Sequence, residues 1–500
     1  MKKTLLVVID ALNSETLLPE LKRFPTLAGL AELGQLREKS ISIFPSLTPA
    51  ATSTLVTGGY PSRHNILGFH WYDQDNQQDV YYGDDFWVVA KLGFGEFFEE
   101  CLKKLNGTRL RLPTLFQIAE RNGMRAASLN YLMFHGDQSH KVEVPLWFSW
   151  HPSVEAQQSV SGPQTLYFGD MVDSDRERDQ DSPDRKGGLL GRFGFNDQNT
   201  ARLLLHLADQ DELPDFTLAY FPDHDYHCHE HGPEAGLEQV EEVDQALADF
   251  FAKLGGMEKA LEHLTVVITG DHSQSAMKEE DAGIPLDEML KDFKVAPSGS
   301  WPDDCRLKVC PDMRTAQLYF REKAVLDEVL ACLLDDPRVD QVLWRNQGGF
   351  QVARGEARLS FRPGDQIGDA YQGRWDFEGD LSAVDASLRD GQLEYGDYPN
   401  ALERIVGGLD NRDGGHLWVT SRPGYEFKTG DTSIHGGGGS HGSLHHLDST
   451  SPLFVAGYPG SLKLPDITRA VDVTPICMGS LGLEPEFAVG APRFRQTVRA

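Results

Sequence analysis

Residues 4–10 read TLLVVID, a short run of aliphatic and β-branched residues that ends in a carboxylate. The same arrangement returns in residues 264–272, LTVVITGDH, which end in Asp271 and His272. Runs that are apolar throughout are typical of strands buried on both faces, as in a parallel sheet. Because ligands of such sheets gather at the carboxyl ends of the strands, Asp10, Asp271 and His272 mark a candidate site.

The regular alternation of such runs with helical patterns over residues 1–290 predicts an α/β fold, with a mostly parallel central sheet and helices on both faces. The expected strands are residues 4–9, 40–44, 124–130, 216–221 and 264–269. The expected helices include residues 112–122, 195–210 and 234–254.

Residues 290–425 break this pattern. They read as strand–helix–strand followed by β-like segments, and the earlier pattern returns with SPLFVAG at residues 451–457. We therefore predict a catalytic core made of residues 1–289 and 426–500, with residues 290–425 as an inserted α+β cap.

Composition excludes several classes of partner. The chain has 500 residues and a formal net charge of −29, which argues against a nucleic-acid groove or an anionic membrane surface. No apolar stretch approaches the ~18 residues of a transmembrane helix. The lysines and apolar run at the start resemble a signal peptide, but the run stops at Asp10 without a cleavage site and reads as a buried first strand.

The six cysteines are sparse and irregularly spaced. Such spacing is not a disulfide framework and fits a reducing, cytoplasmic location. Cys305 and Cys310 could pair across a turn, but reduced thiols are favoured.

Residues 44–59, FPSLTPAATSTLVTGG, contain Thr48 followed by Pro49, and AATSTLVT reads as a short helix closed by Gly58. A threonine N-cap with proline at the first helical position is a favoured helix start, so Thr48 could serve only as a cap. The same position places a hydroxyl beside unpaired backbone N–H groups, where anions bind. A metal ion there would turn the hydroxyl into a nucleophile.

Residues 221–233, FPDHDYHCHEHGP, offer several ligands. Asp225 and His229 stand four residues apart, so on a helical turn they share one face and could hold one ion. Other candidates in the segment are Asp223, His224, His227 and His231. His441 lies in the glycine-rich residues 436–443, GGGGSHGS, where glycines would let the backbone approach a metal closely.

Six segments together resemble the type I phosphodiesterase/nucleotide pyrophosphatase branch of the alkaline phosphatase superfamily. They are VVIDAL (7–12), FPSLTPAATSTLVTGGYPSRHNILG (44–68), DHDYHCHEHGP (223–233), VVITGDHSQS (266–275), GGSHGSLHHLDSTSPLFVAG (438–457) and DVTPICMGSLGL (472–483). The resemblance implies two divalent ions, zinc being the first expectation, while manganese or iron would suit the same ligands. It assigns Asp225, His229 and His441 to one ion. It assigns Asp10, Thr48, Asp271 and His272 to the other, with Thr48 as the covalent nucleophile.

The chain departs from this family at one position. Where the pyrophosphatases usually carry a phosphate-binding asparagine, residues 64–73, HNILGFHWYD, have Phe69. His70 or the Thr48 N–H could take over that contact. Trp71 and Tyr72 could stack on a base, although core aromatics are the commoner case.

The resemblance implies metal-dependent hydrolysis of a small-molecule phosphate diester or pyrophosphate through a phospho-threonine. A phosphomonoesterase or phosphonate hydrolase on the same two-metal site is the alternative. The sulfatase nucleophile motif C/S-x-P-x-R is absent, so sulfate esters are not expected as substrates. A non-enzymatic metal-binding protein would show a broken ligand set, and all seven positions are intact.

Overall fold

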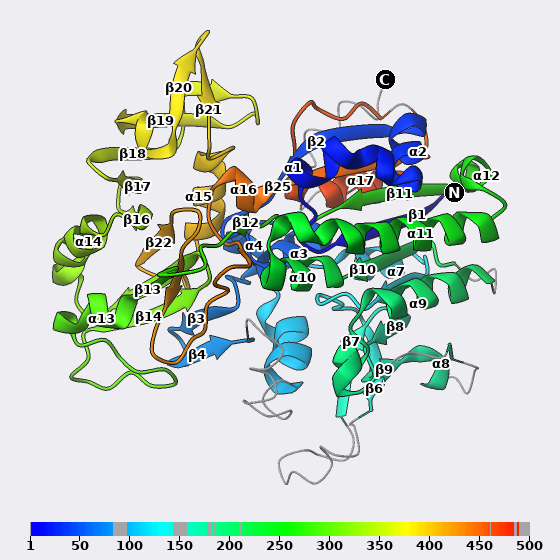
Figure 1. Cartoon of the computed structure of the whole chain (residues 1–500), viewed down its shortest axis with the longest axis horizontal. Helices are drawn as coiled ribbons and strands as arrows, with labels where there is room; N and C mark the ends of the chain where they lie inside the picture. Colours follow the sequence, from blue (N-terminus) through cyan, green and yellow to red (C-terminus); the bar gives the residue numbers. More distant parts are fainter. Residues whose placement is uncertain are drawn as a thin grey trace.

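The computed structural model describes residues 2–83, 98–143, 158–177, 182–183, 187–209, 213–460, 462–484 and 488–489. Within these residues the chain forms two sheets of nine strands, with most helices packed around the first sheet (Figure 1). All six cysteines are free thiols. No helix in the described ranges has both the length and the apolar character needed to cross a bilayer.

The first sheet contains the strands predicted from the apolar runs. Its spatial order is β26 (Thr468–Arg469), β2 (Gln35–Ile41), β25 (Thr450–Ala456), β11 (Leu264–Thr269), β1 (Lys3–Ile9), β10 (Phe216–Phe221), β5 (Ala126–Leu129), β8 (Thr165–Phe168) and β9 (Val172–Asp173). The central strand β1 pairs parallel with β10 and with β11, so Ile9 lies beside Phe221 and Val8 beside Thr269. The carboxyl ends of these three strands therefore lie next to one another.

Side chains of β1 alternate between two buried clusters on opposite faces of the sheet. Leu5 and Val7 pack in one cluster, and Leu6 and Val8 pack in the other. The first face is covered by α2 (Pro25–Leu33), α9 (Asp197–Asp209), α11 (Leu237–Lys253) and α12 (Met257–His263). The second is covered by α3 (Thr48–Thr57), α7 (Leu115–Arg121) and α17 (Val473–Ser480). The predicted α/β fold with helices on both faces is confirmed.

One predicted strand is misplaced. The strand expected at residues 40–44 is β2, which ends at Ile41 and pairs antiparallel with β25 and parallel with β26. Its middle, residues 37–39, is the polar sequence REK and is partly exposed, so the apolar run marked only the end of the strand. The strands expected at 216–221 and 264–269 match β10 and β11 in both bounds.

The second sheet is largely antiparallel and takes its strands from residues 307–421. These are β14 (Leu307–Asp312), β15 (Thr315–Phe320), β22 (Leu417–Ser421), β16 (Val339–Asn346), β17 (Gly349–Arg354), β18 (Ala357–Asp369), β21 (Gln392–Tyr395) and β20 (Ala386–Arg389), with β19 (Arg374–Gly379) paired to β18. The helix α14 (Leu326–Asp335) packs on this sheet. The helix α15 (Ala401–Leu409) lies against α4 (Pro61–His64), the short helix that follows α3. That the second sheet forms a separate cap domain stays a prediction.

A pair of two-residue strands connects segments that lie far apart in sequence. β12 (Ser275–Ala276) pairs antiparallel with β24 (Gly439–Ser440). The pairing brings the chain that leaves β11 against the glycine-rich residues before His441. The helix α10 (Asp223–His231), which follows β10, lies beside β24 as well.

Candidate metal centre

The edge formed by the ends of β1 and β11 gathers Asp10, Asp271 and His272. The Nε2 atom of His272 lies 3.5 Å from Oδ1 of Asp10 and 3.6 Å from Oδ2 of Asp271. All three side chains are buried, and one ligand atom from each lies within 4.8 Å of the others. The shared edge of parallel strands thus assembles one group of metal-ligand type.

The Thr48 hydroxyl faces this group. Thr48 is the first residue of α3, and its Oγ1 lies 3.0 Å from Nε2 of His272. The alternative that Thr48 serves only as a cap does not hold, because the N-cap is Leu47 and no side chain caps the helix. The helix closes as expected at Gly58, which has φ +66°. The hydroxyl therefore contacts His272 and does not cap its own helix.

A second group lies beside the first. Asp225 and His229 share one face of α10, as the four-residue spacing predicts, with His229 Nε2 3.3 Å from Asp225 Oδ2. His441 Nε2 lies 3.9 Å from Asp225 Oδ1. Ligand atoms of Asp225, His272 and His441 lie within 4.8 Å of one another, so His272 stands between the two groups.

The other candidate ligands of the same segment make different contacts. His224 is buried, and its Nδ1 donates to the backbone oxygen of Asp10 at 2.8 Å. The rings of His227 and His231 pack on each other with centroids 4.5 Å apart. Asp223 forms an ion pair with Arg192.

Backbone carbonyls orient two of the imidazoles. His229 Nδ1 lies 2.8 Å from the oxygen of Gly439, and His441 Nδ1 lies 2.7 Å from the oxygen of Ser46. A carbonyl can only accept, so each Nδ1 carries the proton and each Nε2 keeps its lone pair for the site. Metal-binding histidines are held in this manner.

The close approach at His229 requires glycine. A Cβ added at Gly438 would lie 1.8 Å from the backbone oxygen of His229. One added at Gly439 would lie 2.2 Å from Oε1 of Gln274 and 2.8 Å from the oxygen of Cys228. The backbone of Gly438 and Gly439 thus packs directly against α10, and this segment is not a flexible linker.

Burial and charge shift the pKa values of the group in opposite directions. The pKa of Asp10 is raised well above its usual range, first by burial and then by the charges of Asp271 and Asp225. Burial also lowers the pKa of His441 well below its usual value. Burial would raise the pKa of Asp225 too, but His229 and the other histidines hold it well below its usual range.

Several buried atoms of these groups have no hydrogen-bond partner within the described part of the chain. They are Oδ1 of Asp10, Oδ2 of Asp271 and Nε2 of His441. Unpaired buried carboxylates and imidazole lone pairs are costly, and a cation would satisfy all three. The donor set of oxygen and imidazole nitrogen suits zinc and similar ions. The residues present therefore fit a pair of divalent ions.

Sequence reasoning missed the residues that support the ligands. The Tyr220 hydroxyl donates to the Asp10 carboxylate, and Gln274 Nε2 donates to the backbone oxygen of Asp225 at 3.1 Å. His435 places its ring 4.2 Å from that of His229 and its Nδ1 2.9 Å from the buried Glu426. Gln274 could have been found because it follows His272 by two residues, whereas Tyr220 carries no sequence signal of this kind.

The chain around Phe69 is already hydrogen-bonded. The N–H groups of Phe69 and His70 donate to Oδ2 of Asp312 at 2.8 and 3.1 Å. The His70 N–H therefore has a partner other than substrate. Trp71 and Tyr72 are buried, at 2% and 7% exposure, as core aromatics are.

Comparison with known proteins agrees with this geometry. The family model "Type I phosphodiesterase / nucleotide pyrophosphatase" matches residues 4–444. The search of curated proteins gave no match.

Solved structures share the fold at low sequence identity. Inactive murine ectonucleotide pyrophosphatase/phosphodiesterase 5 in complex with AMP has a TM-score of 0.58 and 12% identity, with 100% of each chain covered. The human protein of the same name has a TM-score of 0.57 and 14% identity, with 99% of each chain covered. Phosphonoacetate hydrolase from Sinorhizobium meliloti 1021, in complex with phosphonoformate, has a TM-score of 0.56 and 15% identity, with 95% of this chain and 94% of that chain covered. Because the family model spans most of the sequence, the chain belongs to the type I phosphodiesterase/nucleotide pyrophosphatase family of hydrolases.

Proposed function

We propose that this protein hydrolyses phosphate diesters or pyrophosphates of small molecules, with Thr48 as a covalent nucleophile. The observation that carries the proposal is the Thr48 hydroxyl, 3.0 Å from His272 at the point where the two ligand groups meet. Covalent catalysis needs a nucleophile held in this way.

Two divalent ions would be held by the residues of the two groups. Asp10, Asp271, His272 and Thr48 would hold one, and Asp225, His229 and His441 would hold the other. When bound, such ions lower the pKa of a hydroxyl and neutralise charge on a phosphoryl group. This is the local positive charge that an anionic substrate needs on a chain of net charge −29.

The protein residues set the order of bonds. Thr48 attacks phosphorus in line, forming a bond from its oxygen to phosphorus as the bond to the leaving oxygen breaks, and its hydroxyl proton ends on that leaving oxygen. Water then cleaves the phospho-threonine, restores the hydroxyl and releases the phosphate product. Burial of Thr48, at 7% exposure, keeps bulk water from competing with the first step.

Phosphonate hydrolysis is the second candidate, because phosphonoacetate hydrolase has the same fold and its structure holds phosphonoformate. Against it, the murine relative binds AMP, the product type expected of a nucleotide diesterase. Phe69, at the position of the usual asparagine, leaves nucleotide preference to be measured.

The test is turnover by metal-reconstituted protein on bis-p-nitrophenyl phosphate, p-nitrophenyl phosphate, a dinucleotide pyrophosphate and phosphonoacetate. We expect the diester or the pyrophosphate to give the highest kcat/KM. Rapid acid quench with a diester should trap the phosphoryl group, with its remaining ester, on the peptide that contains Thr48, seen by mass spectrometry. A preference for phosphonoacetate, or a trapped phosphate on another residue, would contradict the proposal.

A further inference from the structure

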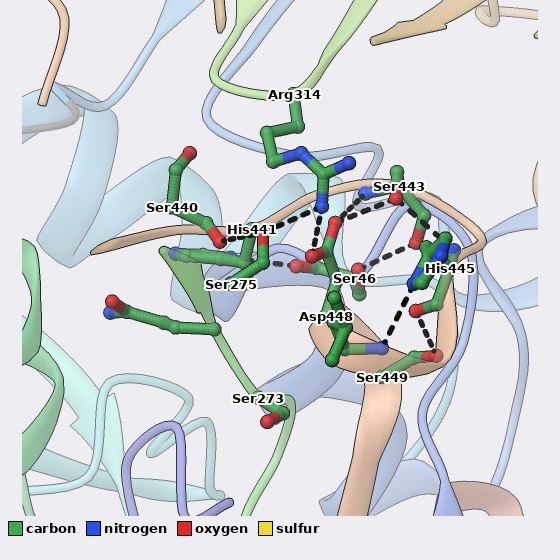
Figure 2. A network of polar contacts seen from close by, with 12 residues as sticks. Ser46, Ser273, Ser275, Arg314, Ser440, His441, Ser443, His445, Asp448 and Ser449 are labelled. Atoms are coloured by element: carbon green, nitrogen blue, oxygen red, sulfur yellow. Dashed lines mark hydrogen bonds and ion pairs between the residues drawn. The ribbon is translucent and has the colours of Figure 1, made fainter. Parts of the chain in front are cut away.

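Arg314 is a fully buried arginine of the second sheet that reaches the segment carrying His441. It lies in the turn between β14 and β15 and has 0% exposure. Its Nη1 donates to the Asp448 carboxylate and, at 2.8 Å, to the Ser275 hydroxyl (Figure 2). Its Nη2 donates to the backbone oxygen of Ser421 at 2.9 Å. The guanidinium thus joins β22 of the second sheet to β12 and to α16 (His446–Ser449), the short helix that precedes β25.

Asp448 connects this arginine to both ligand-bearing loops. Its Oδ2 accepts the N–H of Ser443 at 3.0 Å and the Ser443 hydroxyl at 2.6 Å (Figure 2). Its backbone oxygen accepts the N–H of Ser273 at 2.9 Å. Ser443 follows His441 by two residues, and Ser273 follows His272 directly. Asp448 therefore holds the chain next to two of the proposed ligands, through its carboxylate at Ser443 and through its backbone oxygen at Ser273.

His441 itself is held from two sides. The backbone N–H of Arg314 donates to the backbone oxygen of His441 at 3.1 Å. Its Nδ1 donates to the oxygen of Ser46 at 2.7 Å, and the Ser46 hydroxyl donates to the oxygen of Ser443 at 2.9 Å (Figure 2). Ser46 precedes Thr48 by two residues, so the chain that sets the imidazole also leads into the nucleophile.

The chemistry of this contact requires arginine. Its planar fork can bind a carboxylate, a hydroxyl and a carbonyl together, whereas a lysine ammonium is a point charge on a flexible stem. A buried ion pair stabilises a fold weakly compared with an apolar replacement, so its presence calls for a role in fixing one arrangement. The pair lies between the second sheet and the His441 loop, and that loop is what it fixes.

We infer that Arg314 and Asp448 are a positioning pair that sets the orientation of His441, so that the second sheet controls affinity for the ion held by Asp225, His229 and His441. The inference rests on the proposed function for the presence of that ion. It assigns the second sheet a task other than covering substrate: completing a metal centre built on the first sheet. Neither residue touches the reacting atoms.

The experiment measures zinc affinity directly. Apo-protein is titrated with zinc in competition with a chromophoric chelator, and with cobalt to record the absorption spectrum. We expect Arg314→Lys and Asp448→Asn to weaken one of two sites by about 10- to 100-fold, the range seen when an outer partner of a metal ligand is lost. The other site should change by less than about twofold, and the cobalt spectrum of the weakened site should shift.

A double variant separates positioning from stability. Arg314→Met with Asp448→Leu replaces the buried pair with apolar groups, which usually restores stability. We expect thermal stability to recover while the zinc site stays weak. Recovery of zinc affinity together with stability would show that the pair only stabilises the fold and would overturn the inference.

A matched control uses a buried pair remote from the ligands. Arg469 Nη2 lies 2.8 Å from Asp472, and both side chains are buried. Asp472→Asn should lower stability without weakening either zinc site. Should Arg314→Lys fail to fold, Ser443→Ala removes the hydroxyl that donates to Asp448 and accepts the His445 N–H, and we expect a several-fold loss at the same site.

Wild-type affinity at both sites in folded Arg314→Lys and Asp448→Asn, or in Ser443→Ala, would overturn the inference and leave the proposed function standing. Wild-type protein that binds no zinc or cobalt would instead overturn the proposed function, and this inference with it.

Discussion

The imidazole rings of His272 and His441 stack with centroids 3.8 Å apart and planes 14° apart. His272 lies near Asp10 and Asp271 and also belongs to the group that contains Asp225 and His441. Stacked rings at this distance are favourable when both are uncharged, and burial lowers the pKa of His441 accordingly. The stack therefore fixes how close the two groups stand, a separation that a two-metal site needs to be short.

Thr48→Ala should abolish turnover, because it removes the hydroxyl that lies 3.0 Å from His272. Metal content should stay near that of wild type, since the other proposed ligands remain. Thr48→Ser keeps the hydroxyl and should retain part of the rate. Steady-state assays with elemental analysis measure both properties. A rate for Thr48→Ala close to wild type would rule out the covalent route.

His441→Ala should lose one ion selectively, because it removes an imidazole whose Nε2 faces Asp225. His227→Ala is the matched control, since its ring packs on His231 and it lies on the same helix as Asp225. We expect elemental analysis to give one ion fewer for His441→Ala and no change for His227→Ala. The reverse pattern would show that the ligand assignment within α10 is wrong.

Gly439→Ala should weaken the same metal site, because its Cβ would lie 2.2 Å from Gln274 and force β24 away from α10. Gly107→Ala is the control, because a Cβ there meets nothing within 4 Å. We expect zinc affinity to fall about tenfold or more in the first variant, the scale of a displaced supporting group. Equal affinity in the two variants would mean that the close packing of Gly439 against α10 does not affect metal binding.

His64 should make stability fall with acid. Burial lowers the pKa of His64 to about 3, and its two nitrogens bond Thr54 and the Ile66 N–H. The unfolded chain takes up a proton below pH ~6.5 while the folded chain does not, so stability is full above that pH and is lost as pH falls toward 3. Between pH 7.5 and 5 the loss should be about 2 kcal/mol.

Urea unfolding with excess chelator measures this change, since chelator removes the pH dependence of metal binding. His64→Gln keeps polar contacts without titrating and should show a loss smaller by about 2 kcal/mol over the same interval. Identical pH dependence in the two proteins would place the acid sensitivity elsewhere.

Phe69→Asn should raise kcat/KM on nucleotide diesters more than on bis-p-nitrophenyl phosphate, because phenylalanine cannot donate a hydrogen bond to a phosphoryl oxygen. Its backbone N–H should stay on Asp312, which holds the loop in place. Phe69→Leu controls for the loss of the ring. If asparagine and leucine act alike on both substrates, the missing side-chain donor does not limit this enzyme.

The local pattern of the sequence was enough for the first sheet. Strands such as residues 264–269 are apolar throughout because both of their faces are covered, and this is visible without knowing the neighbours. The position of Asp10 and Asp271 after such strands predicted that they would meet, since parallel strands end at a common edge. The i, i+4 spacing of Asp225 and His229 likewise needed only the geometry of one helix.

Tertiary structure alone decided which side chains support the ligands. Tyr220 and Arg314 act through contacts that join residues 210 and 134 positions apart, and no local periodicity records such contacts. The bounds predicted for β2 were wrong for a related reason. Pairing with β25, and not the apolar character of the strand, fixes where β2 begins and ends. The threonine–proline start of α3 suits a cap as well as a nucleophile, so local sequence does not fix where the Thr48 hydroxyl lies. The path of the chain places it 3.0 Å from His272, and Leu47 takes the N-cap position. Catalysis by Thr48 stays a proposal.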